Sequence, residues 1–409
     1  MCEPQRPPHL PPLSSVLPPI VLGTATFNTQ YVDDPAAMPY RGIVRRALVD
    51  LGVTGFDTSP YYGPSELLLG EALEATGVDR SRYFLETKAG RVTGNGFDYS
   101  ASAIQASVRR SLQRLRTPYV DLVFAHDAEF VSPAEVVTAV RALRQLRTAA
   151  DGSSGIVRYV GISGFPVDVL ASLAEQILAE TGEPVDAVLS YGHCTVQNAR
   201  LLGDPVARLA RAGVSVVLNA SLLNMGLLTT RGVDNGPQAA WHPSPPELRD
   251  ASAAAARVCK EDPLPASLGM KGIEQVALRY ALDVWARAAA SAGVATTVLG
   301  AGASVGSSVL GVTSAPELDE TMLEWWSVLD GLGIEHGSLE QLQTTAGVGS
   351  EADGPAKKDA AIARTQAVKT FVEEKLWPVF GTYKDFAWAS PGEGFVNELK
   401  PAGANDGKP

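Results

Sequence analysis

The sequence predicts a (β/α)8 TIM barrel, eight parallel strands surrounded by helices, with a C-terminal helical and aromatic extension. Two observations lead to this prediction. Short apolar, β-branched runs alternate with longer amphipathic segments from residue 20 to residue 330, and the alternation repeats eight times. Such alternation is typical of a parallel sheet with crossover helices, and eight units over this length favour a closed barrel over an open doubly wound sheet.

Each element is predicted from its own pattern. Residues 120–125 are almost purely apolar, as expected for a strand buried on both faces. Residues 101–115 place Ile104, Val108, Leu112 and Leu115 at helical spacing. By the same criteria the strands are predicted at 20–24, 55–57, 83–88, 120–125, 157–162, 187–190, 215–220 and 307–312. The helices are predicted at 41–50, 65–75, 101–115, 133–147, 168–179, 205–212, in a long region running through 278–290, and at 317–329.

Three segments lie outside the barrel predicted for residues 19–330. Residues 1–18 are rich in proline, which predicts an extended and loosely packed N-terminus. Residues 331–358 are rich in Gly, Ser and acidic residues, which predicts a flexible insertion. Residues 359–409 begin with a predicted helix. Five aromatic residues follow, too many for a disordered tail, so this segment is expected to pack on the barrel: Trp377, Phe380, Tyr383, Phe386 and Trp388.

Composition excludes several classes of protein. Of the 409 residues, 45% are apolar and 19% are charged, which suits a protein with a large buried core. The net charge of −11 gives no basic surface for nucleic acid. The three cysteines lack the spacing of a zinc site or a disulfide framework, so no metal is expected and a reducing compartment is indicated.

Targeting signals are not expected either. The N-terminus lacks the pattern of a signal peptide. Residues 288–316 carry no charge, but their small residues indicate a helix end, a loop and a buried strand rather than a membrane span. We therefore expect a cytoplasmic protein without membrane or nucleic-acid partners. The sequence makes no prediction of oligomeric state.

Chemically useful side chains gather at three successive strand ends. Asp57 ends the second strand and Tyr62 lies in the following loop, while Lys88 and His126 end the third and fourth strands. Barrel active sites form at these carboxyl ends. A tyrosine with an ordinary pKa of about 10 is a poor acid or base near neutrality, but a neighbouring ammonium lowers that pKa and a carboxylate holds the ammonium in place. The pattern predicts proton transfer coupled to hydride transfer, with His126 orienting the substrate oxygen or sharing the proton.

These residues resemble the catalytic tetrad of the aldo-keto reductase superfamily. The resemblance rests on Asp-Thr-x-x-x-Tyr-Gly at residues 57–63, the strand-end lysine and the strand-end histidine, and it extends over residues 20–330. It implies an oxidoreductase with a nicotinamide cofactor, in which Tyr62 transfers the proton and Asp57, Lys88 and His126 support it.

The resemblance also implies a set of cofactor contacts. Three departures weaken individual contacts: Gly164 replaces an asparagine, Ser190 a glutamine, and Ala220 a tyrosine that stacks on the nicotinamide. Gly311 and Glu317 stand where NADP-dependent relatives place a lysine and an arginine. A carboxylate there repels a 2′-phosphate and accepts hydrogen bonds from a ribose diol, so NAD is expected. The expected cofactor residues are Gly23, Thr24, Ser163, Ser190, Ser221, Leu222, Gly226, Leu228, Gly311, Thr313, Glu317 and Thr321.

Two further segments are similar to the sugar-oxidising branch of the family, which contains D-arabinose 1-dehydrogenase and L-galactose dehydrogenase. They are the loop around Trp241-His-Pro and the aromatic tail around Trp388. The likeness implies that Trp241 and Trp388 contact an aldose of the D-arabinose, L-galactose or L-fucose type. The expected reaction is NAD-dependent oxidation of the anomeric C1 hydroxyl to the lactone. Two alternatives stay open: a general NAD(P)H-dependent aldehyde or ketone reductase, and a cofactor-sensing regulatory subunit.

Overall fold

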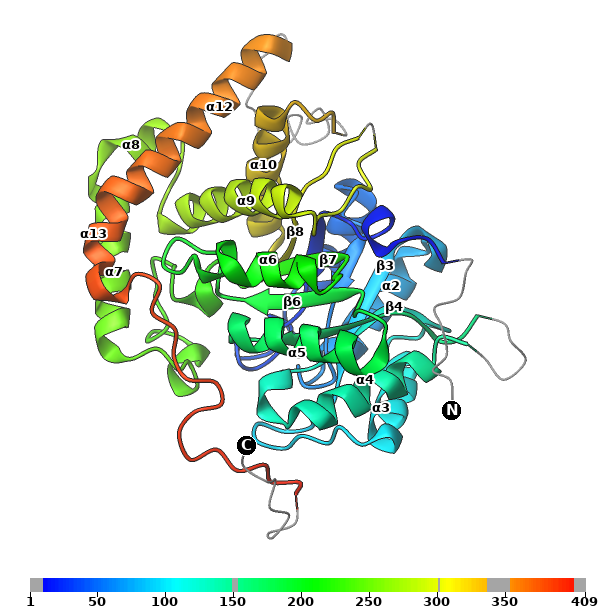
Figure 1. Cartoon of the computed structure of the whole chain (residues 1–409). Helices are drawn as coiled ribbons and strands as arrows, with labels where there is room; N and C mark the ends of the chain where they lie inside the picture. Colours follow the sequence, from blue (N-terminus) through cyan, green and yellow to red (C-terminus); the bar gives the residue numbers. More distant parts are fainter. Residues whose placement is uncertain (1–9, 149–153, 301, 337–353, 401–409) are drawn as a thin grey trace.

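The computed structural model describes residues 10–148, 154–300, 302–336 and 354–400. Eight parallel strands close into a barrel in sequence order, and the last strand pairs with the first (Figure 1). The predicted (β/α)8 barrel is therefore confirmed. The strands are β1 (Ile20–Gly23), β2 (Gly55–Asp57), β3 (Phe84–Ala89), β4 (Val120–Ala125), β5 (Val157–Gly164), β6 (Ala187–Tyr191), β7 (Val216–Ala220) and β8 (Ser307–Gly311).

The helices lie close to their predicted positions, except before β8, where the single long helical region is divided into three helices. Helix α4 shows how the sequence sets a boundary, because Ser132 and Glu135 form a capping box and Pro133 occupies the first turn. The barrel helices are α1 (Tyr40–Arg45), α2 (Ser65–Thr76), α3 (Ala101–Arg114), α4 (Pro133–Gln145), α5 (Val167–Thr181), α6 (Asp204–Arg211), α7 (Pro246–Glu261), α8 (Pro263–Ser267), α9 (Ile273–Ala292) and α10 (Ala315–Leu332).

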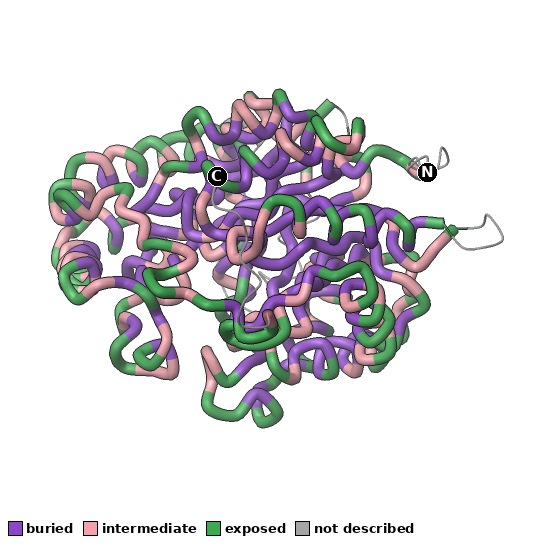
Figure 2. Tube along the Cα trace, turned by 60° about the horizontal axis from the view of Figure 1, so that its bottom comes forward, coloured by how far each residue is buried: buried purple, intermediate pink, exposed green. Residues whose placement is uncertain are grey.

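Buried residues concentrate in the strands and on the inner helix faces, while exposed residues follow the outer helix faces (Figure 2). Strand β4 is buried along its whole length, as its apolar sequence predicts. A separate apolar cluster fills the inside of the barrel and includes Phe84, Leu122, Phe124, Tyr159 and Leu218. The barrel is therefore a packed core, and its open end is left to the loops that follow the strands.

The N-terminal segment closes one end of this core. Leu13 and Leu17 are fully buried in the cluster inside the barrel. The Tyr159 hydroxyl donates to the carbonyl of Pro11 at 2.8 Å, and the Thr296 hydroxyl donates to the carbonyl of Ser14 at 3.0 Å. The prediction of a loosely packed N-terminus is therefore wrong for residues 13–18, because two leucines there gain more from burial than the proline-rich composition suggests.

The C-terminal extension starts with α12 (Gly354–Phe371), followed by the short α13 (Trp377–Phe380). Arg279 of α9 donates to the hydroxyl of Thr365 at 2.6 Å, and Arg364 forms an ion pair with Glu324 of α10. Figure 1 shows α12 and α13 beside α7 and α8. The predicted insertion at 331–358 is narrower than expected, since its first two residues complete α10 and its last five begin α12. Residues 337–353 lie outside the described part of the chain.

The tail after α13 crosses the loops at the carboxyl ends of the strands. The Gln197 side chain, after β6, donates to the carbonyl of Phe386 at 3.0 Å. Trp388 stacks on Phe165, after β5, with ring centroids 4.6 Å apart. Further along, the Asn397 side chain pairs with both backbone groups of Phe97, after β3. Three βα loops are thus held together by one segment.

The uncharged segment 288–316 comprises the end of α9, a loop and β8, as its sequence predicts. None of the described helices is both long enough and apolar enough to cross a membrane.

We predict that Leu13→Ala lowers the free energy of unfolding by ~2–5 kcal/mol, because it leaves a cavity inside the barrel. Urea denaturation measures this change. The control is Leu67→Ala in α2, where the side chain is 54% exposed and a change within ~0.5 kcal/mol is expected. Equal effects of the two substitutions would show that the N-terminal segment contributes nothing to the core.

Candidate active site

The structure brings the four predicted catalytic residues together at the carboxyl end of the barrel. Asp57 is the last residue of β2, Lys88 lies near the end of β3, and His126 follows β4. Tyr62 lies in the loop between β2 and α2. All four line one cavity of about 1170 Å³. This volume exceeds the roughly 300–1000 Å³ of a pocket for one small molecule.

Asp57 and Lys88 form a buried ion pair. The Lys88 ammonium also donates to the carbonyl of Thr58 at 3.0 Å. Burial alone would lower the pKa of Lys88, but the Asp57 carboxylate raises it above its ordinary value, so the side chain is a cation near neutrality. Its Nζ lies 5.0 Å from the centroid of the Tyr62 ring. The pair therefore fixes a positive charge beside the tyrosine.

A second carboxyl lies beside this pair. Glu86 precedes Lys88 by two residues in β3 and is fully buried, and its carboxyl is hydrogen-bonded to that of Asp57. Burial, and next the charge of Asp57, raises the pKa of Glu86 well above its ordinary value. Glu86 is therefore neutral, and Asp57 alone supplies the charge that balances Lys88.

The Tyr62 hydroxyl retains its proton near neutrality. Burial raises the pKa of Tyr62 to about 12, although Lys88 lowers it. The expectation that the ammonium brings this pKa below its ordinary value is therefore wrong for the protein by itself, because desolvation outweighs the ammonium. The phenol is a proton donor near neutrality, and Lys88 stabilises the phenolate that forms when the proton leaves.

His126 completes the tetrad. Its ring lies edge-on to Tyr62 with centroids 5.8 Å apart, and its Nδ1 is 3.1 Å from the Ser59 hydroxyl. The Ser59 oxygen already accepts the backbone N–H of Tyr61, so we assign the hydroxyl hydrogen to Nδ1 and the ring hydrogen to Nε2. Burial lowers the pKa of His126 to about 3. His126 is therefore a neutral hydrogen-bond donor. Because Ser59 occupies Nδ1, Nε2 is the ring nitrogen that can donate to a molecule in the cavity.

Most of the predicted cofactor residues line the same cavity, which extends from the tetrad to the start of α10. The loop after β7 turns through four left-handed residues, Ser221, Asn224, Met225 and Gly226, a conformation that can present backbone N–H groups to an anion. The set fits a dinucleotide: a polar group near the tetrad, a cradle for the pyrophosphate and an acceptor for a ribose. The lining members are Gly23, Ser163, Ser221, Leu222, Gly226, Gly311, Thr313, Glu317 and Thr321.

Three predicted cofactor residues do not line the cavity, so their assignment as cofactor contacts is corrected. The Thr24 hydroxyl donates to the carbonyl of Asp57 at 2.9 Å and accepts from Ser65, which ties β1 to β2. Ser190 lies between Leu189 and Tyr191, both of which line the cavity, and alternation along a strand turns it to the opposite face. Leu228 is fully buried in a cluster with α7, α9 and the C-terminal helices.

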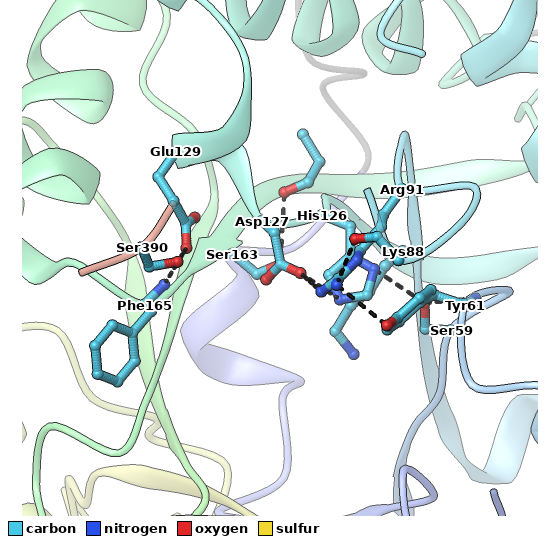
Figure 3. Close-up of polar contacts among 12 residues, drawn as sticks. Ser59, Tyr61, Lys88, Arg91, His126, Asp127, Glu129, Ser163, Phe165 and Ser390 are labelled. Atoms are coloured by element: carbon cyan, nitrogen blue, oxygen red, sulfur yellow. Dashed lines mark hydrogen bonds and ion pairs between the residues drawn. The ribbon is translucent and has the colours of Figure 1, made fainter. Parts of the chain in front are cut away.

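The loss of the asparagine at position 164 has a structural explanation. A Cβ atom at Gly164 would lie 2.2 Å from Oε2 of Glu129, so a larger residue there would require the Glu129 carboxyl to shift. Oε1 of Glu129 accepts from the backbone of Phe165 at 3.1 Å and from the hydroxyl of Ser390 at 2.8 Å (Figure 3). Glu129 therefore occupies the space beside position 164 and joins the tail to two strand ends.

A charged wall beside His126 was not assigned a role from sequence. Asp127 forms an ion pair with Arg91, and Arg91 also donates to the Tyr61 hydroxyl at 3.1 Å (Figure 3). All three residues line the cavity. Burial alone would raise the pKa of Asp127, but His126 and Arg91 lower it below its ordinary value. Their positions in the sequence could have predicted this wall, because Arg91 and Asp127 follow β3 and β4, and residues that follow barrel strands lie at the active-site end.

The two predicted substrate tryptophans also line the cavity. The indole N–H of Trp241 donates to the carbonyl of Gln30 at 2.8 Å, so the loop after β7 meets the loop after β1. His242 lies between the two indoles, with ring centroids 5.7 Å from Trp241 and 5.4 Å from Trp388. Within the described residues, no group of three His, Cys, Asp or Glu side chains could hold a metal ion.

Fold and tetrad together define a nicotinamide-dependent oxidoreductase built on a TIM barrel. The profile of the Aldo/keto reductase family matches residues 19–328, and the chain belongs to this family, whose members use nicotinamide cofactors. Among its relatives, D-arabinose 1-dehydrogenase of Saccharomyces cerevisiae is 38% identical over 67% of this chain and 77% of that protein. L-galactose dehydrogenase of Arabidopsis thaliana is 36% identical over 72% of this chain and 80% of that protein. D-threo-aldose 1-dehydrogenase of a Pseudomonas species is 26% identical over 55% and 72%.

We predict that Tyr62→Phe lowers turnover at least ~10²-fold, the usual scale for a lost acid–base group, with cofactor affinity unchanged. Steady-state kinetics and cofactor titration by tryptophan fluorescence measure the two effects. Lys88→Met acts through the same proton, so the double variant should be far from additive. Tyr83→Phe, directly before β3, is the control and should retain wild-type turnover. Near-normal turnover of Tyr62→Phe would refute the assignment.

A second prediction concerns the stability effect of Glu129. Burial, and next the charge of Asp127, raises the pKa of Glu129 to about 8, whereas the unfolded chain ionises near 4.3. Between these values the native state retains a proton that the unfolded state has lost, so its contribution to stability falls as pH rises and levels off above about 8. Glutamine does not titrate, so the stability of Glu129→Gln does not fall in this way. The melting temperature of Glu129→Gln minus that of the wild type should therefore rise by a few degrees between pH 5 and pH 8. A difference that is constant with pH would contradict the assignment.

Proposed function

We propose that the protein oxidises the anomeric C1 hydroxyl of an aldose to the lactone, with NAD as the hydride acceptor. The observation that carries this proposal is the position of Trp241 and Trp388 on the cavity that contains the tetrad. An aromatic wall suits the apolar face of a sugar ring, and the polar groups opposite can bind its hydroxyls. The sugar dehydrogenases among the relatives support the same assignment.

The tetrad performs the proton transfer. The substrate oxygen lies between the Tyr62 hydroxyl and Nε2 of His126, which donates a hydrogen bond and orients it. For oxidation the Tyr62 phenol first loses its own proton to solvent, and the phenolate oxygen then takes the substrate hydroxyl proton. In the reverse direction the protonated phenol donates that proton to the substrate oxygen. Lys88 stabilises the phenolate, and Asp57 keeps Lys88 charged and in place. A bound nicotinamide cofactor supplies or accepts the hydride.

The preference for NAD rests on Glu317 at the start of α10. Its carboxylate accepts the backbone N–H of Thr313 at 2.7 Å and the Thr313 hydroxyl at 2.9 Å. These two hydrogen bonds hold the carboxylate on the part of the cavity that is formed by the loop after β8 and the start of α10. Lys271 is a cation at the same end that sequence reasoning did not place there, but it is paired with Glu320 at 2.5 Å. A 2′-phosphate would be repelled by the carboxylates of Glu317 and Glu320, the second of which also pairs with Lys271, whereas a ribose diol would find an acceptor in Glu317.

We predict a higher kcat/KM with NAD than with NADP, and a shift of that ratio by ~10-fold or more toward NADP in Glu317→Arg, because arginine binds phosphate through paired hydrogen bonds. Glu261→Arg is the control, since it makes the same charge change at an exposed position at the end of α7. An equal or better efficiency of the wild type with NADP would overturn the cofactor proposal.

The substrate is tested with a panel of sugars and aldehydes. D-arabinose, L-galactose and L-fucose share the configuration at carbons 2 to 4, and we expect NAD-dependent oxidation of these three, D-arabinose best, with little activity on D-glucose. The general-reductase alternative uses the same tetrad. It would replace the proposal if simple aldehydes were reduced far more efficiently than any of the three sugars was oxidised.

A further inference from the structure

The charged wall of Asp127, Arg91 and Tyr61 has no role in the proton transfer performed by the tetrad. Asp127 directly follows His126 and has a left-handed backbone with φ of 54°, which a residue with a side chain rarely adopts. Its side chain is 3% exposed and lines the cavity. A residue keeps such a conformation only where the surrounding structure holds it there, and proton transfer by the tetrad does not require it at Asp127.

One oxygen of Asp127 is committed and the other is not. Oδ2 accepts from Nη1 of Arg91 at 2.5 Å and lies 3.7 Å from Nε2 of His126. Oδ1 accepts no hydrogen bond from the part of the chain that the structure describes. An ionised carboxylate has about four acceptor positions, so Asp127 can accept further donors from a molecule in the cavity.

Arg91 holds this carboxylate in place, and most of its own N–H donors are already used within the protein. Its Nη2 donates to the Tyr61 hydroxyl at 3.1 Å and to the carbonyl of Gly94 at 3.0 Å. Its guanidinium lies 3.8 Å from the centroid of the Tyr61 ring, with Phe97 and Phe130 also nearby. Within this wall the acceptor is the Asp127 carboxylate, while the Tyr61 hydroxyl, which accepts from Arg91, keeps its own hydrogen for donation. The negative charge of Asp127 suits a ligand hydroxyl rather than a ligand carboxylate or phosphate.

We propose that Asp127 accepts a hydrogen bond from the substrate hydroxyl on the carbon next to the reacting one, and so selects aldoses and other 2-hydroxy aldehydes over unsubstituted aldehydes. This assignment rests on the proposed function and on the position of Asp127 next to His126. The reacting oxygen is held by Nε2 of His126, and Asp127 lies directly beside that nitrogen. The hydroxyl at carbon 2 is the donor of an aldose that lies nearest to the reacting oxygen. The substrate class is thus selected at the residue that follows the catalytic histidine.

The test compares substrates that differ only in that hydroxyl, in wild type and in Asp127→Asn. Lactaldehyde and propanal are the pair for reduction, and D-arabinose and its 2-deoxy analogue are the pair for oxidation. A hydrogen bond to a charged group corresponds to a preference of ~10–100-fold in kcat/KM for the hydroxylated member. In Asp127→Asn the ratio of kcat/KM between the two members of each pair should fall to within about threefold. Asp168→Asn, on the exposed start of α5, is the matched control.

A binding measurement accompanies the kinetics. In the Tyr62→Phe background, isothermal titration calorimetry with the aldonolactone and its 2-deoxy analogue should show that Asp127→Asn weakens only the former. Asp127→Ser removes the carboxylate with less bulk and replaces Asp127→Asn if that variant does not fold. The proposal is overturned if the wild type shows no preference within either pair, or if both members of a pair are affected equally by the substitution.

The outcomes separate this inference from the proposed function. A wild type that oxidises no aldose but prefers lactaldehyde through Asp127 would refute the sugar assignment and support the inference. A wild type that oxidises D-arabinose and its 2-deoxy analogue equally well would support aldose oxidation and refute the inference.

Discussion

The site depends on one interaction, the buried ion pair between Asp57 and Lys88. Two neighbouring barrel strands bring these side chains together, since Asp57 ends β2 and Lys88 lies near the end of β3. Burying two charges costs free energy that their attraction often does not repay, so such a pair is a poor device for stability alone. Its value lies in holding a cation beside the Tyr62 phenol, where the cation stabilises the phenolate that forms when the proton leaves. Tyr62, His126 and the cavity are arranged around that cation.

The remaining walls come from segments outside the barrel pattern. The C-terminal tail contributes Trp388 and Ser390, and its contacts join the loops after β3, β4, β5 and β6. Glu129 joins the tail to two of these loops, and in this position its carboxyl fills the space beside Gly164. The glycine at position 164 and the extension that contributes Trp388 to the cavity are thus in contact through Glu129. The barrel supplies the chemistry, and the extension shapes the space in which it occurs.

Much of this arrangement could be predicted from sequence because it follows local patterns. Strand and helix periodicities specified the barrel, and the strand ends located Asp57, Tyr62, Lys88 and His126. Other features depend on contacts between distant residues. Leu13 and Leu17 lie in a proline-rich segment, and nothing in the local sequence predicts that they pack into the apolar core inside the barrel. Local sequence likewise does not show that Ser190 faces away from the cavity or that Lys271 reaches it, since both depend on how strands and loops are oriented in three dimensions.

If the Asp57–Lys88 pair serves the chemistry rather than the fold, the double variant Asp57→Asn/Lys88→Met should separate stability from turnover. Its free energy of unfolding and its turnover are measured beside those of the two single variants. Each single variant leaves one buried charge uncompensated and should lose ~3–5 kcal/mol. The double variant should recover wild-type stability while its turnover stays at least ~10²-fold lower. A double variant that remains as unstable as the single ones would show that the pair is needed for the fold. A double variant that turns over substrate at the wild-type rate would show that the pair is not needed for the chemistry.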